Sequence, residues 1–182
     1  ADADAVAEGE TRAHVGHGLV VAAGVAPAGN QVARLARPPG HEPDDHGADV
    51  AFGNLEGTLT TSGSSTKDVS SGRSYAFRTP PDYAAHLVAA GFDVMSLANN
   101  HIGDAGRTGM LQTLRNLDRR GLAHGGLGRN IEQAHEATLL EAGGVAVGLL
   151  GYDTIAPGYH AGEDLAGSAG MSKKALRQDI RR

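Results

Sequence analysis

The fold is decided by residues 90–104, which read AGFDVMSLANNHIGD. Across residues 92–98 the side chains are almost all apolar, a pattern typical of a strand that is buried on both faces of a parallel sheet. Asn99, Asn100 and His101 follow at once. The stretch therefore predicts a buried strand that ends in a polar turn.

Helix signals flank this strand on both sides. Pro80 and Pro81 open a helix that ends at Gly91. A longer helix is predicted over residues 106–120, ended by Gly121. The apolar faces are expected to hold Tyr83, Leu87 and Val88 in the first helix and Met110, Leu111, Leu114 and Leu117 in the second.

Further strand and helix signals alternate along the chain, which predicts an α/β fold with a largely parallel sheet. Residues 49–55 are a strand candidate that runs into a polar turn, and the Ser/Thr/Gly-rich residues 60–74 predict a long mobile loop. Other expected strands cover 19–24, 123–126, 139–140 and 145–150, and the last two form a hairpin with its turn at 143–144. Expected helices cover 30–37, 130–137 and 172–182, and expected loops cover 38–47 and 155–170.

Composition limits the class of protein. The chain has 182 residues, enough for one domain of ordinary size. Its formal net charge of −5 argues against a nucleic-acid partner, because such binders carry a basic face. It has no cysteine, so disulfides, thiolate zinc sites and cysteine nucleophiles are excluded. The residues show neither a signal peptide nor a membrane-spanning apolar run, so they leave the localisation unknown.

Two polar turns stand out because each directly follows a predicted strand. One covers residues 53–57 and the other 99–104, and open α/β sheets bind ligands beyond the carboxyl ends of their strands. Glu56 offers a carboxylate, Asn100 an amide oxygen and His101 an imidazole, a set that suits Mn²⁺, Fe, Zn²⁺ or Mg²⁺. The imidazole can also move a proton. The alternative is that these are ordinary turn residues, since Asn and Gly are common in turns.

Five blocks of the sequence resemble the CapA family of bacterial capsule-synthesis proteins, the poly-γ-glutamate biosynthesis family. They are residues 48–60, 75–80, 90–106, 128–130 and 143–152. The Asn-Leu-Glu and Asn-Asn-His runs within them are specific to that family. The resemblance covers residues 48–182 and leaves residues 1–47 as an atypical, loop-rich leader with one expected strand. It implies a calcineurin-like metallophosphoesterase fold, a four-layer α/β sandwich, with about its N-terminal half in this chain.

The resemblance also implies roles for the residues of the two turns. Glu56 matches the metal-bridging carboxylate and Asn100 an asparagine metal ligand, while His101 matches the catalytic histidine. The residues implied to support and order these turns are Asn54, Asn99 and Asp104.

Two departures from the family pattern bear on the metal. Family members follow their first strand with Gly-Asp-Val, whose aspartate is a metal ligand, but here residues 20–24 are followed by Val-Ala-Pro-Ala-Gly at 25–29. Asp44 and Asp45 are poor replacements because they lie in an expected loop. The family's later histidine motifs have no counterpart before Arg182, so we expect the chain to be truncated and its divalent-metal site to be incomplete.

The resemblance implies a role in making or exporting a poly-γ-glutamate capsule at the bacterial cell envelope. The implied partners are the anionic polymer or a phosphate-containing substrate, together with other membrane subunits of capsule synthesis. Two alternatives stay open: a metal-dependent phosphoesterase that acts on a small phosphate ester, and a non-catalytic scaffold subunit with a degenerate site. The missing aspartate favours the scaffold over the small-ester enzyme, and enzymatic activity itself stays open.

Other polar clusters give weaker signals. His14, His17, His41 and His46 have loose metal-like spacing, but histidines scattered in such a tract are usually solvated. The basic residues of the predicted helix over 172–182 are expected to form its solvated face rather than a phosphate site.

Overall fold

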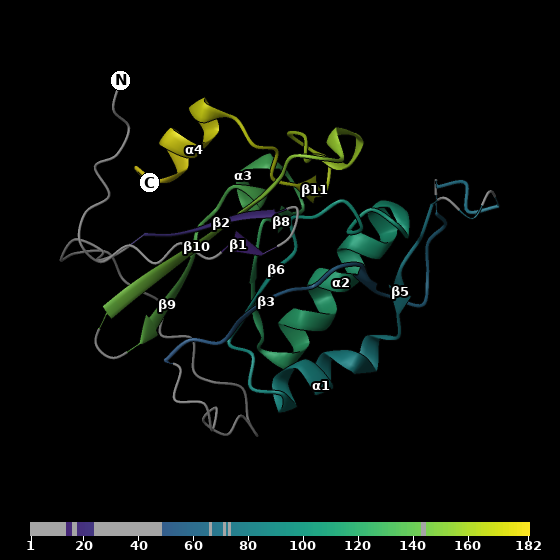
Figure 1. Cartoon of the computed structure of the whole chain (residues 1–182), viewed down its shortest axis with the longest axis horizontal. Helices are drawn as coiled ribbons and strands as arrows, with labels where there is room; N and C mark the ends of the chain where they lie inside the picture. The colour runs from purple at the N-terminus through teal and green to yellow at the C-terminus, as the bar shows by residue number, and fades with distance from the viewer. Residues whose placement is uncertain are drawn as a thin grey trace.

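The computed structural model describes residues 14–15, 18–23 and 49–182, with gaps at 66, 71, 73, 143 and 144 (Figure 1). For residues 14–15 and 18–23 the description is limited to the backbone. Outside the described residues lie the predicted helix over 30–37, the predicted loop over 38–47, the segment 25–29, Asp44, Asp45, the hairpin glycines at 143–144, and His17, His41 and His46.

Three parallel strands form the sheet that carries both polar turns. They are β3 (Phe52–Asn54), β6 (Val94–Ser96) and β7 (Ala123–Gly125), in the order β3-β6-β7. β3 pairs with β6 in the register Asn54↔Ser96. The two strands that were predicted to end in polar turns are therefore neighbours, and both turns leave the sheet at the same edge.

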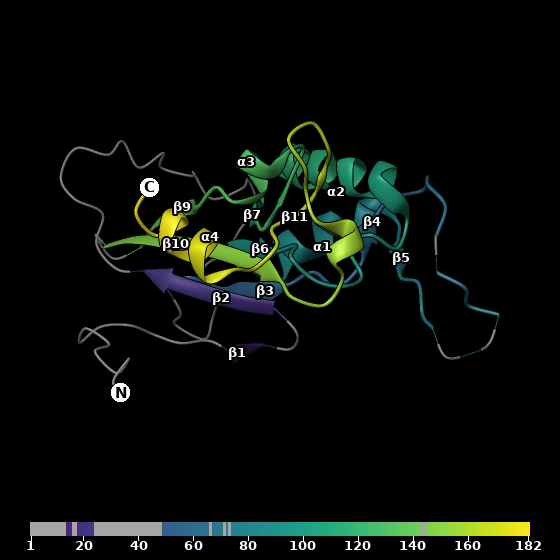
Figure 2. The ribbon, with the colours of Figure 1, turned by 90° about the horizontal axis from the view of Figure 1, so that it is seen from above.

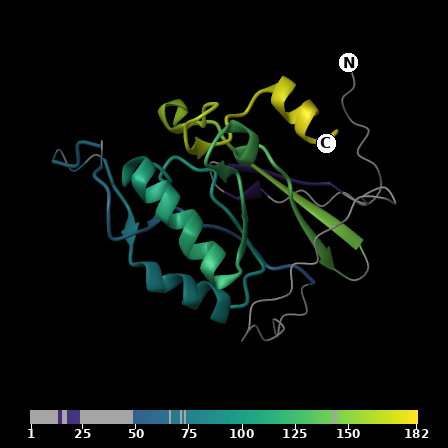
Figure 3. The same ribbon diagram turned by 180° about the vertical axis from the view of Figure 1, so that it is seen from behind.

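Two helices cover one face of this sheet, as Figure 3 shows. They are α1 (Ala84–Ala89), which follows the 3₁₀ turn η1 (Pro81–Tyr83), and α2 (Gly106–Arg120). The predicted bounds of α2 are confirmed, and Gly121 ends it with a φ of 65°, a left-handed conformation that glycine adopts without strain. The core between helices and sheet includes Met95, Leu97, Met110, Leu114 and Leu117.

The prediction that Tyr83 belongs to the apolar face of the first helix is wrong. Tyr83 belongs to the 3₁₀ turn, where 53% of its surface is exposed, whereas Val88 is buried as predicted. Beside α2 lie two short parallel strands, β4 (Thr58–Leu59) and β5 (Arg78–Thr79). The connection between these strands contains no helix or strand among its described residues, in agreement with the loop predicted over 60–74.

A second sheet covers the other face of β3-β6-β7, and all its strand pairs are antiparallel. Its order is β1 (His14–Val15), β2 (Gly18–Ala23), β10 (Val145–Asp153) and β9 (Thr138–Ala142). The expectation of a largely parallel sheet is thus correct for β3-β6-β7 and wrong for the second sheet, in which the predicted hairpin pairing of β9 with β10 is confirmed. β9 and β10 are joined by a short connection, which imposes antiparallel pairing, and β2 adds to β10 in the opposite direction.

β6 contributes to both cores because successive side chains alternate across a strand. Val94 packs with Leu149 between the two sheets, whereas Met95 packs against the helices. Ser96 faces the second sheet at Gly151, where a Cβ atom would lie 2.9 Å from the Ser96 Oγ. Figure 2 shows the layers, with α2 on one side, β2 on the other and β6 between them. The architecture is a partial α/β sandwich.

Short elements complete the C-terminal part of the chain. α3 (Ile131–Ala134) is shorter than predicted because the chain turns at His135 before it enters β9, and Asn130 caps α3 as predicted by accepting the N–H of Gln133 at 2.9 Å. The other elements are β8 (Leu127–Gly128), η2 (Pro157–Tyr159), β11 (Gly167–Ser168) and α4 (Lys173–Asp179). The residues predicted as loop over 155–170 therefore include two short elements. None of the described helices is both long and apolar enough to cross a membrane.

Asp179 holds α4 against the second sheet. Its Oδ2 atom lies 2.7 Å from Nδ1 of His135 and accepts the hydroxyl of Tyr152 at 2.9 Å. Tyr152 and Asp179 are both buried. Burial and the hydrogen bond to Asp179 raise the pKa of the Tyr152 hydroxyl. The basic residues of α4 are exposed, as predicted.

The raised pKa of Tyr152 predicts a loss of stability at high pH. The unfolded tyrosine ionises near its ordinary pKa of 10.0 while the folded one stays protonated, so the free energy of unfolding falls as the pH rises above that value. Tyr152→Phe should remove this part of the pH dependence, whereas Tyr75→Phe, at an exposed position, should leave it. Urea unfolding between about pH 8 and about pH 11 measures the effect. The same slope in wild type and Tyr152→Phe would contradict it.

Candidate functional site

Asn99 links the two polar turns through hydrogen bonds of its side chain. Its side-chain amide donates to Oδ1 of Asn54 at 3.1 Å and to the carbonyl of Leu55 at 2.9 Å. Its Oδ1 atom accepts the backbone N–H of His101 at 3.0 Å. Asn99 is only 2% exposed, so these hydrogen bonds form out of contact with water. The structure thus brings together the two turns that follow β3 and β6.

His101 lies between two carboxylates. Its Nδ1 atom is 2.8 Å from Oδ2 of Asp104, and its Nε2 atom is 3.6 Å from Oε1 of Glu56. Because an ionised carboxylate can only accept hydrogen bonds, we assign a proton to Nδ1, which leaves Nε2 facing Glu56. The ring of Phe77 stacks on the imidazole, with centroids 4.3 Å apart and 28° between the planes. These contacts fix the orientation of the ring.

Asp104 is a buried carboxylate whose polar partners come from separate segments of the chain. Its side chain is 1% exposed. Besides its contact with His101, it accepts the backbone N–H of Phe77 at 2.6 Å, and its Oδ1 atom pairs with the ammonium of Lys67 at 2.6 Å. A buried charge is costly unless it is paired and hydrogen-bonded. These partners offset that cost and hold the site together.

No sequence pattern singles out Lys67 or Phe77 as site residues. Lys67 comes from the connection between β4 and β5; its ammonium donates to the carbonyl of Asn100 at 3.2 Å and lies 3.2 Å from Nδ1 of His101. A lone lysine in a Ser/Gly-rich stretch has no spacing that indicates a partner. Phe77 lies in the family-like block at 75–80, which marks the segment but not the contact with His101.

Glu56 and Asn100 carry oxygens with unused acceptor capacity. The Glu56 side chain is 45% exposed, and its contacts with Asn54 Nδ2 and His101 Nε2 are long, at 3.5 and 3.6 Å. The Oδ1 atom of Asn100 is buried and has no hydrogen-bond partner among the described residues. An orphaned buried acceptor costs about 1–3 kcal/mol, which a bound cation would recover.

A carboxylate and an amide oxygen are ligand types that divalent ions accept. Hard oxygen ligands suit Mn²⁺ and Mg²⁺, and a carboxylate also suits Zn²⁺ and Fe. Among the described residues there is no group of three or more His, Asp or Glu side chains that could hold a metal ion. Glu56 and Asn100 are therefore the candidate ligands that the described residues supply.

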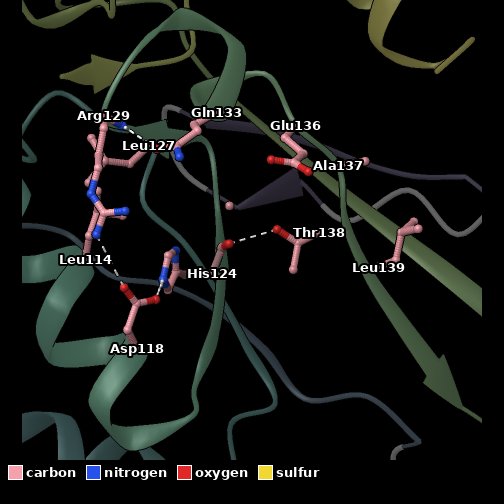
Figure 4. Close-up of a pocket in the computed structure, with 11 residues that line it drawn as sticks. Leu114, Asp118, His124, Leu127, Arg129, Gln133, Glu136, Ala137, Thr138 and Leu139 are labelled. Carbon is pink, nitrogen blue, oxygen red and sulfur yellow. Dashed lines mark hydrogen bonds and ion pairs between the residues drawn. The ribbon is translucent and has the colours of Figure 1, made fainter. Parts of the chain in front are cut away.

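A separate hollow of about 470 Å³ lies between α2, β7 and the start of β9 (Figure 4). Within it, Oδ1 of Asp118 is 3.0 Å from Nε2 of His124, and Oδ2 of Asp118 is 3.8 Å from the guanidinium of Arg129. The Nδ1 atom of His124 is buried without a partner among the described residues. No sequence signal marks these residues, and the hollow is lined by none of the six predicted site residues.

A family model described as "Bacterial capsule synthesis protein PGA_cap" matches residues 43–182. The chain belongs to this bacterial capsule synthesis family. The matched range contains both polar turns, Lys67 and Phe77. The predicted resemblance to capsule-synthesis proteins of the CapA type is thereby confirmed.

Curated relatives of this family member come from two bacteria. The uncharacterized proteins y4sH and y4uA of Sinorhizobium fredii (strain NBRC 101917 / NGR234) are each 38% identical over 124 residues, which are 67% of this chain and 27% of the relative. Capsule biosynthesis protein CapA of Bacillus anthracis is 33% identical over 92 residues, which are 50% of this chain and 22% of the relative. The chain thus spans about a quarter of the length of these relatives.

Removal of the Asp104 charge should destabilise this member of the capsule synthesis family. Asp104→Asn leaves the ammonium of Lys67 without its ion-pair partner, and loss of one partner of a largely buried pair costs on the order of 3 kcal/mol. Asp68→Asn is the matched control, because Asp68 is exposed on the same connection. The free energy of unfolding in urea measures both changes. A loss in Asp104→Asn no greater than that in the control would contradict this reading of the site.

Proposed function

We propose that this protein acts in the synthesis of a bacterial capsule, with poly-γ-glutamate as the polymer and the cell envelope as its location. The family match over residues 43–182 and the similarity to CapA of Bacillus anthracis support the capsule role. The polymer is polyanionic, so cationic groups in the site are a suitable means of recognition. Other subunits of capsule synthesis are its expected partners.

The site acts in this proposal as a metallophosphoesterase-like centre. Glu56 and Asn100 hold a divalent ion (Mn, Fe, Zn or Mg), and the observation that carries this assignment is the buried, unpartnered Oδ1 atom of Asn100. Water, or residues beyond those described, supply the other ligands. When bound, the ion polarises a phosphoryl oxygen as a Lewis acid.

His101 moves the proton in this centre. The stacked ring of Phe77 and the carboxylate of Asp104 hold its imidazole, so that Nε2 is the nitrogen that faces Glu56. An imidazole held in this way gives or takes a proton at Nε2. Asn99 maintains the spacing of the two turns through its hydrogen bonds to both.

Metal binding tests the ligand assignment without any assumption about the substrate. Titration with Mn²⁺, followed by electron paramagnetic resonance, should show affinity at least about tenfold weaker in Glu56→Gln and in Asn100→Ala. Glu132→Gln is the matched control because Glu132 is an exposed carboxylate on α3. Mn²⁺ affinity that is unchanged in both ligand variants would show that the assignment is wrong.

Hydrolysis of phosphate esters tests the catalytic part. His101→Ala should retain Mn²⁺ and lose about 10²- to 10⁴-fold of the rate on a phosphodiester. Mn²⁺ binding with no hydrolysis of any phosphate ester would favour the non-catalytic scaffold. Hydrolysis of small esters, with normal capsule in a strain that lacks the gene, would favour the small-ester phosphoesterase.

A further inference from the structure

Lys67 is the cationic side chain that the described residues place against the site. Its Nζ atom is 2.6 Å from Oδ1 of Asp104, 3.2 Å from the carbonyl of Asn100 and 3.2 Å from Nδ1 of His101. The side chain is 22% exposed, whereas its partner Asp104 is 1% exposed. The ammonium therefore lies between the buried carboxylate and the solvent at the rim of the site.

A count of protons shows that these contacts leave part of the ammonium unused. A lysine ammonium has three N–H donors: the carbonyl of Asn100 accepts one of them, and Oδ1 of Asp104, 2.6 Å away, is an ion-pair partner that accepts no hydrogen bond. With the proton assigned to Nδ1 of His101, that nitrogen faces Asp104 as a donor and accepts no N–H from the ammonium 3.2 Å away. With this tautomer, the ammonium of Lys67 keeps at least one N–H without an acceptor among the described residues.

The charges around Lys67 make this spare donor significant. Glu56 and Asp104 are carboxylates, and they repel an anion that approaches His101. The hydrogen bonds of the Arg78 and Arg107 guanidinium groups go to backbone carbonyls outside the two polar turns, those of Gly63 and Ala166. Lys67 is thus the cationic side chain whose contacts, among the described residues, lie with Asp104, Asn100 and His101.

We propose that Lys67 is a specificity-determining residue whose spare ammonium N–H binds an anionic oxygen of the substrate, in a phosphate or a polymer carboxylate. The inference rests on the proposed function, because it assigns ligand recognition at the same site. A lysine ammonium suits this task because it binds such oxygens as a point charge without demanding bidentate geometry. The alternative to ligand recognition is a purely structural role. In that role Lys67 only neutralises the charge of Asp104.

Three substitutions separate recognition from support of Asp104. Lys67→Met removes both the charge and the donors, Lys67→Gln keeps an N–H donor without the charge, and Lys67→Arg keeps the charge. Lys173→Met is the matched control, because Lys173 is exposed at the start of α4. Calorimetric titrations with inorganic phosphate and, separately, with an oligomer of γ-linked glutamate measure anion affinity. They are run with and without Mn²⁺, and thermal melting confirms that each variant is folded.

We expect the Kd for the anion to rise roughly ten- to a hundredfold in Lys67→Met and Lys67→Gln, which corresponds to one lost charged hydrogen bond. Lys67→Arg should recover most of the affinity, and Lys173→Met should match wild type. The anion whose affinity falls identifies the source of the oxygen, phosphate or carboxylate. Equal anion affinity in wild type and folded Lys67→Gln would overturn the inference, as would wild type that binds neither anion.

Mn²⁺ binding keeps this result distinct from the test of the metal site. Lys67 is not a proposed metal ligand and carries a positive charge, so Lys67→Gln should bind Mn²⁺ at least as tightly as wild type does. Anion binding that depends on Lys67 in a protein that binds no Mn²⁺ would support the inference and overturn the metal assignment. Mn²⁺ binding through Glu56 with no effect of Lys67 on anions would do the reverse.

Discussion

The parallel pairing of β3 with β6 is the constraint on which the rest of the site depends. Its register sets Asn54 beside Ser96, so the chain leaves both strands at one edge of the sheet and Asn99 can reach across the gap. The pairing is secure because β6 is buried from both sides, with Val94 against the second sheet and Met95 against the helices. Burial of this one short strand thereby determines where the polar turns meet, and the chemistry of the turns plays no part in that choice.

Asp104 has the corresponding role inside the site. A buried carboxylate is costly unless it is paired and hydrogen-bonded, and the partners of Asp104, which is 1% exposed, are the imidazole of His101, the backbone N–H of Phe77 and the ammonium of Lys67. Two of these partners belong to the connection between β4 and β5, which has no helix or strand of its own among the described residues. The buried charge therefore orders that connection against the end of β6, and the orientation of His101 follows from the same set of contacts.

Hydrophobic spacing predicted those features that depend on burial alone. It placed α2 correctly to its end at Gly121, and it placed the strands whose turns meet, because apolar periodicity reports which residues face a core. It predicted the antiparallel hairpin of β9 and β10 but not the antiparallel pairing of β2 with β10, since a buried strand has the same composition in a parallel or an antiparallel sheet. It also missed Lys67 and the burial of Asp179. Each of these depends on polar partners distant in sequence, such as His135, which is 44 residues before Asp179, and no local pattern encodes such pairs.

The balance of charge at the strand ends links the two ligand classes that the site is proposed to bind. Glu56 and Asp104 contribute two negative charges and Lys67 one positive charge, so with a neutral His101 the cluster is negative. A negative cluster attracts a cation. The acceptors that it leaves free for the cation are the exposed carboxylate of Glu56 and the unpartnered Oδ1 atom of Asn100. A divalent ion there would reverse the sign of the local charge. The site repels an anion without the divalent ion and would attract one with it. The ammonium of Lys67 already lies 3.2 Å from Nδ1 of His101, the imidazole nitrogen that does not face Glu56.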